Sequence, residues 1–519
     1  MSNMKRLLLA ATLALMGTGT GASIAAPDDD TIVIGLSADI STLDPAQVDN
    51  RIDMNIAAHL FGTLYTVDSD GKIQPNFATG YKVSDDGTEY TFTIKPGLTC
   101  EDGEKLTAED VAYSFTRAAD PKNGFSGNTP GFVFDALGYK SAEAVDDLNV
   151  KIKFAKKSSI VLGMLSEVFL HCKDSYEKMS AEQASSKPIG SGSYRLVSWD
   201  HGSELVLEKV KDPAVFKKIV VRVIPEASTR TAELIAGNVD VITNVSPDQI
   251  DTINNSGTAD VQKMQGTRRM YVGFNLTGKF SGTKGTDAIK KPEVRRAMQY
   301  ALDVPSICSQ LLSSNCTRLN GPANPPNDNP DLKPYPYDPA QAEKLLDAAG
   351  YPRGADGVRF ELKMQAPRGR YLNDANVALA IGQYLSDIGV KTDVELLDWA
   401  SVYSPLFRTH DAGPLFFIGS GGSTWSAIYD MSDLSTPDAE TNDTGWSDPH
   451  WFDGWAKIDA AKTPEEERAA VNQMLKVFYD DGPWLLLYDQ PDFYGVSKRI
   501  SWKARRDEHI ELFDAKLAK

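Results

Sequence analysis

The segment 77–115 most constrains what this chain can fold into, because it predicts a strand, a turn and a helix in direct succession. Apolar and polar side chains alternate over residues 90–95, which is the period of a strand with one buried face. Pro96 and Gly97 then predict a turn. Residues 106–115 follow with a threonine placed as a cap, acids in the first turn and apolar side chains four positions apart, which predicts an amphipathic helix. A strand that leads directly into a helix indicates an α/β protein.

The rest of the chain repeats this alternation of strands and helices. Proline in the first turn of several predicted helices, and glycine directly after their last turn, mark where they begin and end. A second α/β lobe is predicted after residue 274. Strands are expected over 205–210, 219–223 and 391–397, and helices over 229–236, 292–302, 338–350, 374–388 and 463–478.

The N-terminus carries the pattern of a secretory signal peptide. Lys5 and Arg6 precede the apolar run 7–16, and small residues then lead to a predicted cleavage site after Ala25. No cysteine lies near that site, so we expect no lipid anchor. No later stretch approaches the roughly 20 apolar residues of a membrane-spanning helix. The sequence therefore predicts an exported protein.

The charge of the chain excludes one class of partner. Removing residues 1–25 takes away two basic residues and no acid, so the net charge moves from -17 to -19. A protein this acidic does not bind nucleic acid or anionic lipid through its overall field. We expect no nucleic-acid partner.

Four cysteines in an exported chain indicate disulfides, because the compartment is oxidising. They are Cys100, Cys172, Cys308 and Cys316, which allow three pairings. No two have the CxxC spacing of a zinc or redox site. The six histidines form no HxxxH or HExxH pattern, so no metal site is predicted.

The motifs of the common enzyme classes are missing from the sequence. There is no GxSxG nucleophile elbow, no GxxxxGK[ST] phosphate loop, and no GxGxxG followed by the acid of a dinucleotide site. The adjacent carboxylates at 85–86 and 146–147 point to opposite faces if extended. We predict no catalytic residue and no cofactor, although a glycosidase pair assembled from distant residues stays open as an alternative.

Several blocks together resemble one protein family. Segment 77–115 is similar to the signature of the family 5 extracellular solute-binding proteins of bacterial ABC importers, which include oligopeptide, dipeptide, glutathione and nickel binders. Cys100 and Glu101 depart from that signature, since many members carry an aromatic residue and a histidine there. Further blocks that resemble the family lie at 41–45, 188–194, 233–240 and 294–303.

The resemblance implies a two-lobed periplasmic-binding-protein fold of type II, with an additional inserted domain and a hinge between the lobes. After the signal peptide at 1–25, lobe I is expected to combine 26–50, 190–272 and 490–519, with the inserted domain at 51–189 and lobe II at 273–489. Under this division the pairs Cys100 with Cys172 and Cys308 with Cys316 each fall within one lobe. The resemblance further implies a monomer in the periplasm that delivers its solute to an ABC permease in the inner membrane.

The segment 366–374 is a candidate ligand site. In dipeptide binders a similar segment supplies an arginine that grips the peptide carboxylate, because a guanidinium fork matches a carboxylate in two hydrogen bonds. Arg368 or Arg370 is the expected counterpart, next to Tyr371. An exposed arginine near a helix start is the alternative for each.

A second candidate lies at 417–426. Peptide binders place an aspartate in a similar stretch, where it pairs with the α-ammonium group, but Ser423 occupies that position here. Either another acid supplies the charge or the ligand has no free α-amino group. Gly422, Ser423 and Thr424 would also suit a hydroxyl-rich sugar or an opine. Trp399 and Trp425 are candidates to stack on a ligand, with core packing as the alternative.

The sequence thus predicts the substrate-binding component of an ABC importer for a small solute. The resemblance places a peptide first among the ligands. An opine, an oligosaccharide or a metal chelate is the alternative, and an exported hydrolase or a periplasmic chaperone or sensor is the competing class.

Overall fold

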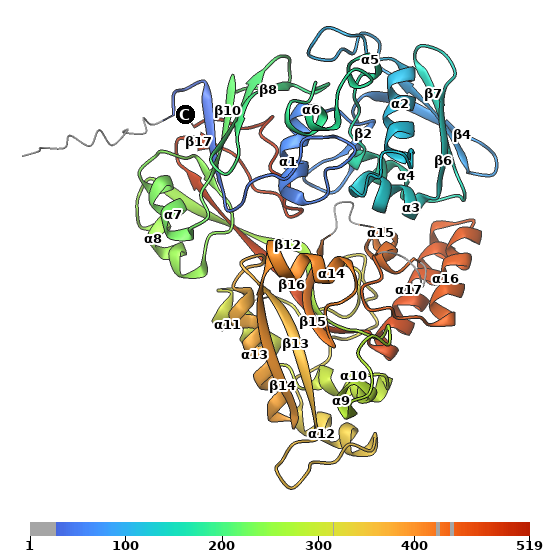
Figure 1. Ribbon diagram of the computed structural model, residues 1–519, viewed down its shortest axis with the longest axis vertical. Helices are drawn as coiled ribbons and strands as arrows, with labels where there is room; N and C mark the ends of the chain where they lie inside the picture. Colours follow the sequence, from blue (N-terminus) through green and yellow to red (C-terminus); the bar gives the residue numbers. More distant parts are fainter. Residues whose placement is uncertain (1–26, 315, 422–425, 436–440, 519) are drawn as a thin grey trace, which may run out of the picture.

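The computed structural model describes residues 27–314, 316–421, 426–435 and 441–518. Figure 1 shows an upper part that holds the N-terminal half of the chain and a lower part that tapers away from it. Two long strands, β12 (Ala259–Phe274) and β16 (Trp484–Ser497), run between the two parts.

A single ten-stranded sheet extends through both parts, in the order β14-β13-β15-β12-β16-β11-β1-β10-β9-β8. The half in the upper part, which we call lobe I, contains β1 (Thr31–Leu36), β8 (Tyr194–Asp200), β9 (Glu204–Lys209), β10 (Lys218–Val223) and β11 (Val241–Ile242). The half in the lower part, which we call lobe II, contains β13 (Phe360–Arg368), β14 (Val390–Asp398) and β15 (Leu415–Gly421).

The sheet is irregular where it passes from one lobe to the other. The antiparallel register of β12 and β16 shifts between Gln265 and Arg269 and again between Arg269 and Tyr271. Such irregularities bend a strand and increase its twist. The two strands that connect the lobes therefore contain a bend at residues 265–271, which is the position expected of a hinge.

A separate four-stranded sheet, in the order β4-β5-β7-β6, forms a second body beside lobe I. We call residues 65–167 the small-sheet unit. It contains β2 (Tyr65–Val67), β3 (Ile73–Pro75), β4 (Ala78–Val83), β5 (Glu89–Ile94), α2 (Ala108–Ala119), η1 (Thr129–Val133), α3 (Phe134–Leu137), β6 (Tyr139–Ala144), β7 (Asn149–Phe154), α4 (Val161–Met164) and η2 (Leu165–Glu167).

The strand, turn and helix predicted in segment 77–115 are confirmed in this unit. β5 alternates buried and half-buried side chains. α2 begins with a capping box, in which the Thr107 side chain accepts a hydrogen bond from the helix start while Asp110 accepts one from the Thr107 N–H at 2.6 Å. Phe92 and Phe115 are both fully buried, so strand and helix share one core.

The other predicted elements are present with ends that differ by at most three residues. They are β9, β10, β14, α7 (Ala227–Ile235), α10 (Pro292–Tyr300), α12 (Pro339–Ala348), α13 (Asp374–Asp387) and α17 (Pro464–Asp481). The remaining elements are α1 (Arg51–Leu60), α5 (Lys173–Tyr176), α6 (Ala181–Ser186), η3 (Pro247–Gln249), α8 (Ile250–Asn254), α9 (Lys284–Ala288), α11 (Val304–Leu311), η4 (Trp399–Tyr403), α14 (Ser404–Arg408), α15 (Ala427–Met431), η5 (Ser432–Leu434), α16 (Pro449–Ala460), β17 (Ile500–Ser501) and β18 (Lys516–Leu517).

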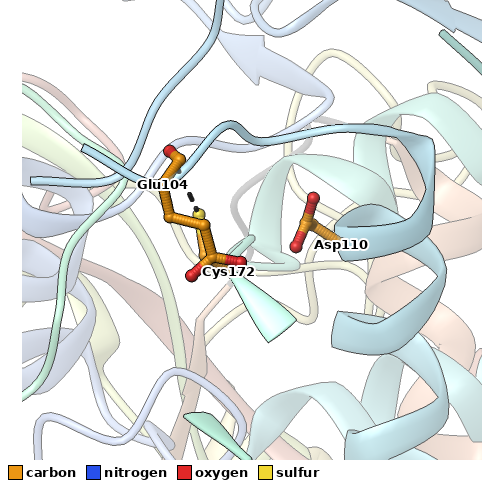
Figure 2. Close-up of side chains that lie close together, drawn as sticks. All are labelled: Glu104, Asp110 and Cys172. Carbon is orange, nitrogen blue, oxygen red and sulfur yellow. Dashed lines mark hydrogen bonds between the residues drawn. The ribbon is translucent and has the colours of Figure 1, made fainter. Parts of the chain in front are cut away.

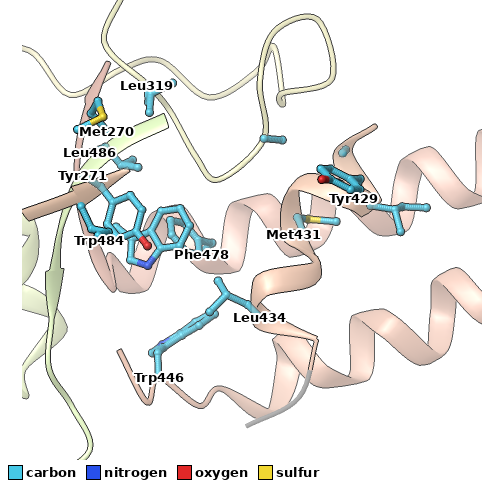
Figure 3. Close-up of a cluster of buried hydrophobic side chains, with 14 of the residues drawn as sticks. Met270, Tyr271, Leu319, Tyr429, Met431, Leu434, Trp446, Phe478, Trp484 and Leu486 are labelled. Atoms are coloured by element: carbon cyan, nitrogen blue, oxygen red, sulfur yellow. The ribbon is translucent and has the colours of Figure 1, made fainter. Parts of the chain in front are cut away.

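Most of the C-terminal tryptophans pack in the core of lobe II. The Tyr271 ring stacks on Trp484 with centroids 3.8 Å apart, and Phe478 meets Trp484 edge-on at 5.1 Å (Figure 3). Trp446, Trp451 and Trp455 are buried in the same cluster. These four tryptophans are therefore packing residues, whereas Trp399, one of the two stacking candidates, is half-buried.

The cysteines are joined as Cys100 with Cys172 and Cys308 with Cys316, the pairing that the expected domain division favours. The first bridge ties the loop after β5 to the start of α5.

Within the described residues, no helix has both the length and the apolar character needed to cross a membrane.

Candidate functional site

The candidate site lies at the end of β13, where lobe II meets lobe I. Asp374, the first residue of α13, folds the preceding loop around its carboxylate. This carboxylate accepts the backbone N–H groups of Gly369, Arg370 and Tyr371 at 3.1, 2.8 and 3.0 Å. Three backbone donors on one carboxylate fix the loop, so the positions of Arg370 and Tyr371 are set by the fold.

The guanidinium of Arg370 is the central group of the site. It lies 5.1 Å from the centroid of the Tyr371 ring and 5.4 Å from that of Trp399. The side chain is half-buried, and no described residue gives it a hydrogen bond or an ion pair. Burial, and then the charge of Arg268, lowers the pKa of Arg370, but an arginine stays charged at physiological pH. The site therefore contains a guanidinium that feels the charges of Glu508 and Asp374 but forms no ion pair with a described residue.

The two candidate arginines differ in environment. Arg368 ends β13 with an exposed side chain, whereas Arg370 lies against the two rings. Tyr371 is buried and donates its hydroxyl to the carbonyl of Gly419 at 3.3 Å, which joins the loop to the end of β15. The structure thus brings together Arg370, Tyr371 and Trp399, and leaves Arg368 at the surface.

On the side of lobe I, the site is bordered by an ion pair that the sequence did not predict. Arg268, at the bend of β12, donates to both carboxylate oxygens of Glu508 at 2.7 and 2.9 Å, and to the carbonyl of Gly419 at 3.3 Å. Burial raises the pKa of Glu508, but the contact with Arg268 outweighs it and lowers the pKa to about 2. Glu508 also has a left-handed backbone with φ of 60°, a strained conformation that clusters at functional sites.

Asp492 on β16 lies beside this ion pair and feels the charge of Glu508. Its side chain is buried and one of its carboxylate oxygens has no hydrogen-bond partner. Burial, and then the negative charge of Glu508, raises its pKa well above the usual value. Arg268 and Glu508 therefore pair with each other, whereas Arg370 has no ion pair among the described residues.

Arg269, the next residue on β12, faces lobe II instead. It pairs with Asp430 of α15, contacts the Asn324 side chain at 2.5 Å, and donates to the Ser420 hydroxyl at 3.0 Å. Asp430 also accepts the backbone N–H of Asn324 at 2.9 Å. Asp430 is the first acid downstream of Ser423, but these contacts occupy it, so it is not available to a ligand.

Two further acids, Asp433 and Asp443, follow Ser420 in the sequence. Asp433 accepts the Ser420 hydroxyl at 2.6 Å, and burial raises its pKa. Asp443 is half-buried, and no described residue donates a hydrogen bond to its carboxylate. Burial, and then the charge of Asp433, raises the pKa of Asp443 well above the usual value. These acids were not predicted, because nothing in the local sequence separates them from surface aspartates.

Four predicted ligand residues, Gly422, Ser423, Thr424 and Trp425, lie outside the described residues. β15 ends immediately before them, and α15 begins two residues after them.

Among the described residues, one group of acids and a cysteine is close enough together to suggest a metal site. Glu104, Asp110 and Cys172 converge in the small-sheet unit and its neighbouring loop (Figure 2). However, Cys172 is part of a disulfide, Asp110 caps α2, and Glu104 accepts the backbone N–H groups of residues 174 and 175. The atoms that could bind a metal are already engaged in the disulfide and in hydrogen bonds, so this group does not form a metal site.

Comparison with known families decides the class of the protein. The family model of the bacterial extracellular solute-binding proteins, family 5, matches residues 72–442. The chain belongs to this family. It is a solute-binding protein and not an enzyme.

Similar proteins and structures extend over almost the whole chain of this family 5 protein. A glutathione-binding protein GsiB of Pectobacterium atrosepticum is 25% identical over 483 residues, which cover 90% of each chain. The fold is similar to that of the periplasmic binding protein DppA of Helicobacter pylori in complex with the peptide STSA, with a TM-score of 0.80, 22% identity, and coverage of 94% and 98% of the two chains. It is also similar to that of AgaA of A. tumefacien R10 in complex with agropinic acid, with a TM-score of 0.78, 24% identity, and coverage of 91% and 94%.

Proposed function

We propose that this family 5 protein is the periplasmic substrate-binding component of an ABC importer, and that its solute carries a carboxylate. The observation that carries the proposal is the unpaired guanidinium of Arg370 beside the rings of Tyr371 and Trp399. A buried positive charge is costly without a partner. A carboxylate of the solute supplies that partner, and the planar fork of arginine holds it with two hydrogen bonds.

The surrounding residues suit a solute that contacts both lobes. Trp399 is half-buried and offers a flat apolar face on lobe II. The ion pair of Arg268 and Glu508 lies on the side of lobe I, with the Arg268 guanidinium 5.8 Å from the centroid of the Tyr371 ring. A solute between them contacts both lobes only when they are together, so binding shifts the population towards the closed form.

Within this class we place peptides and peptide-like solutes first. Asp443 is the acid that we propose for a solute amine, because its carboxylate has no described partner and Ser423 carries no charge. The relatives named above bind glutathione, a peptide and agropinic acid. An opine is the second candidate, favoured by the serine at position 423.

The predicted signal peptide and two disulfides support export to an oxidising compartment. In this proposal the closed protein delivers its solute to a permease in the inner membrane.

Calorimetry on the mature protein tests the ligand class. We expect heat of binding with glutathione, di- or tripeptides, or opines, and none with neutral oligosaccharides. Binding restricted to neutral sugars would contradict the role of Arg370, and turnover of any of these compounds would contradict the class.

A further inference from the structure

The small-sheet unit touches lobe II directly, on the side of the molecule away from β8 and β10. Figure 1 shows α15 on the face of lobe II that is turned towards α3 and α4. One continuous cluster of buried apolar side chains includes both the core of the small-sheet unit and the core of lobe II, whereas the core of lobe I forms a separate cluster. The small-sheet unit is therefore packed against the lobe to which no strand connects it.

The first contact between them is buried. The Tyr429 hydroxyl of α15 donates to a carboxylate oxygen of Glu167 at 3.3 Å, and the Phe132 ring meets the Tyr429 ring at 90° with centroids 5.3 Å apart. The other oxygen of Glu167 accepts the side-chain N–H of Asn128 at 2.9 Å. Glu167 is 2% exposed and Tyr429 is 6% exposed, so both would gain water if the two bodies separated.

The second contact lies at the surface. The Lys156 ammonium is 3.6 Å from the Asp459 carboxylate and 5.6 Å from the centroid of the Trp455 ring. Lys157 donates to the carbonyl of Ala461 at 3.4 Å. A small cavity between the two contacts is lined from both sides, by Ile160 of the small-sheet unit and by Ile428 and Ile458 of lobe II among others. Exposed ion pairs contribute little, so the buried contact is the stronger of the two.

Helix α15 connects this contact to the bend between the lobes. Tyr429 faces the small-sheet unit, and the next residue, Asp430, pairs with Arg269 at the bend of β12. Asp430 also binds the backbone of Asn324 in lobe II. A movement at the bend that displaces Arg269 therefore acts on the helix that carries Tyr429.

We propose that these contacts form a latch that holds the lobes in the closed form. The latch consists of Phe132, Lys156 and Glu167 on the small-sheet unit and of Tyr429, Trp455 and Asp459 on lobe II. Its contacts exist only while the two bodies touch, so each of them shifts the equilibrium towards closure. The latch needs no solute, and its failure would leave the assignment of Arg370 to carboxylate binding untouched.

Zero-length carbodiimide cross-linking of the ligand-free mature protein tests the latch. The reagent joins an amine to a carboxylate in contact, so the closed form yields a product between Lys156 and Asp459. Two ion pairs within single bodies serve as references: Lys153 with Glu89 at 2.8 Å in the small sheet, and Lys476 with Asp480 at 2.7 Å in α17. We expect all three products in the mass spectrum of the digest.

The variant Tyr429→Phe removes one hydroxyl and keeps the ring. It should lower the ratio of closed to open protein by about two- to tenfold, the range that one intramolecular hydrogen bond produces in an equilibrium constant, and so lower the yield of the 156–459 product relative to both references. Absence of this product while the references form, or an unchanged ratio in the variant, overturns the latch. If Tyr429→Phe lowers the references as well, Phe132→Leu decides the question by the same ratio.

Discussion

Arg370 lies with its guanidinium 5.4 Å from the ring centroid of Trp399, and no acid in the described part of the chain forms an ion pair with it. The two residues come from different segments, the loop after β13 and the first residue of η4. The positive charge and the aromatic face are therefore adjacent before any solute binds. Such preorganisation lowers the entropic cost of binding, because few side chains have to be ordered.

Arg370→Ala should weaken the binding of a carboxylate-bearing solute by about 1.5 to 3 kcal/mol, the usual contribution of hydrogen bonds to a charged group. In the dissociation constant this is a factor of about 10 to 150. Arg368→Ala is the matched control, since that side chain is exposed two residues away. Calorimetry with the solute found in the ligand screen measures both. Equal effects of the two substitutions would remove Arg370 from the site.

Trp399→Ala should weaken binding by about 1 to 3 kcal/mol if the ring stacks on the solute. Trp451→Ala is a useful contrast, because Trp451 is fully buried and its indole N–H donates to the carbonyl of Leu434 at 2.7 Å. That substitution should lower the free energy of unfolding by about 3 to 5 kcal/mol, with little effect on the dissociation constant of the folded protein. Denaturant unfolding and calorimetry separate the two effects. An unchanged dissociation constant in folded Trp399→Ala would assign that ring to packing.

The sequence predicted the elements well where one face is buried and the ends are marked. α10, α12 and α17 each have proline in the first turn, and their observed starts agree with the prediction to within one residue. The expected domain boundaries remain a prediction, although α1 packs in the same apolar cluster as β1.

The candidate site was only partly predictable. Arg370 and Tyr371 were predicted because they stand in a segment that resembles known binders, and Trp399 because a large aromatic face suits stacking on a ligand. Arg268, Glu508 and Asp443 were not predicted, because they lie far apart in the sequence. Arg268 and Glu508, for example, are 240 positions apart. Such pairs form because β12 bends and the C-terminal segment packs next to it. Periodicity in the local sequence does not indicate which distant residues come together.

The binding of amine-bearing solutes should depend on pH through Asp443. Its pKa is raised well above the usual value by burial and by Asp433, and a solute ammonium favours the ionised carboxylate. Affinity should therefore fall as the pH falls through the raised pKa, and binding should release protons. Calorimetry in buffers of different ionisation enthalpy measures that release.

Asp443→Asn removes this dependence and weakens the binding of amine-bearing solutes, while solutes without an amine keep their affinity. The same substitution should stabilise the ligand-free protein. The pKa of Asp443 is higher in the folded state than in the unfolded state. Between these two pKa values the folded state retains a proton that the unfolded state has lost. Asp443 therefore lowers the free energy of unfolding as the pH rises through this range. The gain should appear at neutral pH and vanish in acid. A variant that is less stable at neutral pH would contradict this account.

The two disulfides should differ in their effect on stability. Cys100 and Cys172 are 72 residues apart, whereas Cys308 and Cys316 are 8 apart. Closing the longer loop removes more entropy from the unfolded chain, and the difference between loops of these lengths is about 2 kcal/mol. Paired serine substitutions, Cys100→Ser with Cys172→Ser and Cys308→Ser with Cys316→Ser, isolate each bridge without leaving a free thiol. Urea unfolding should show the larger loss for the first pair. A larger loss for the second pair would mean that the short bridge acts on the folded state, through the packing of α11 against α13, and not through the entropy of the unfolded chain.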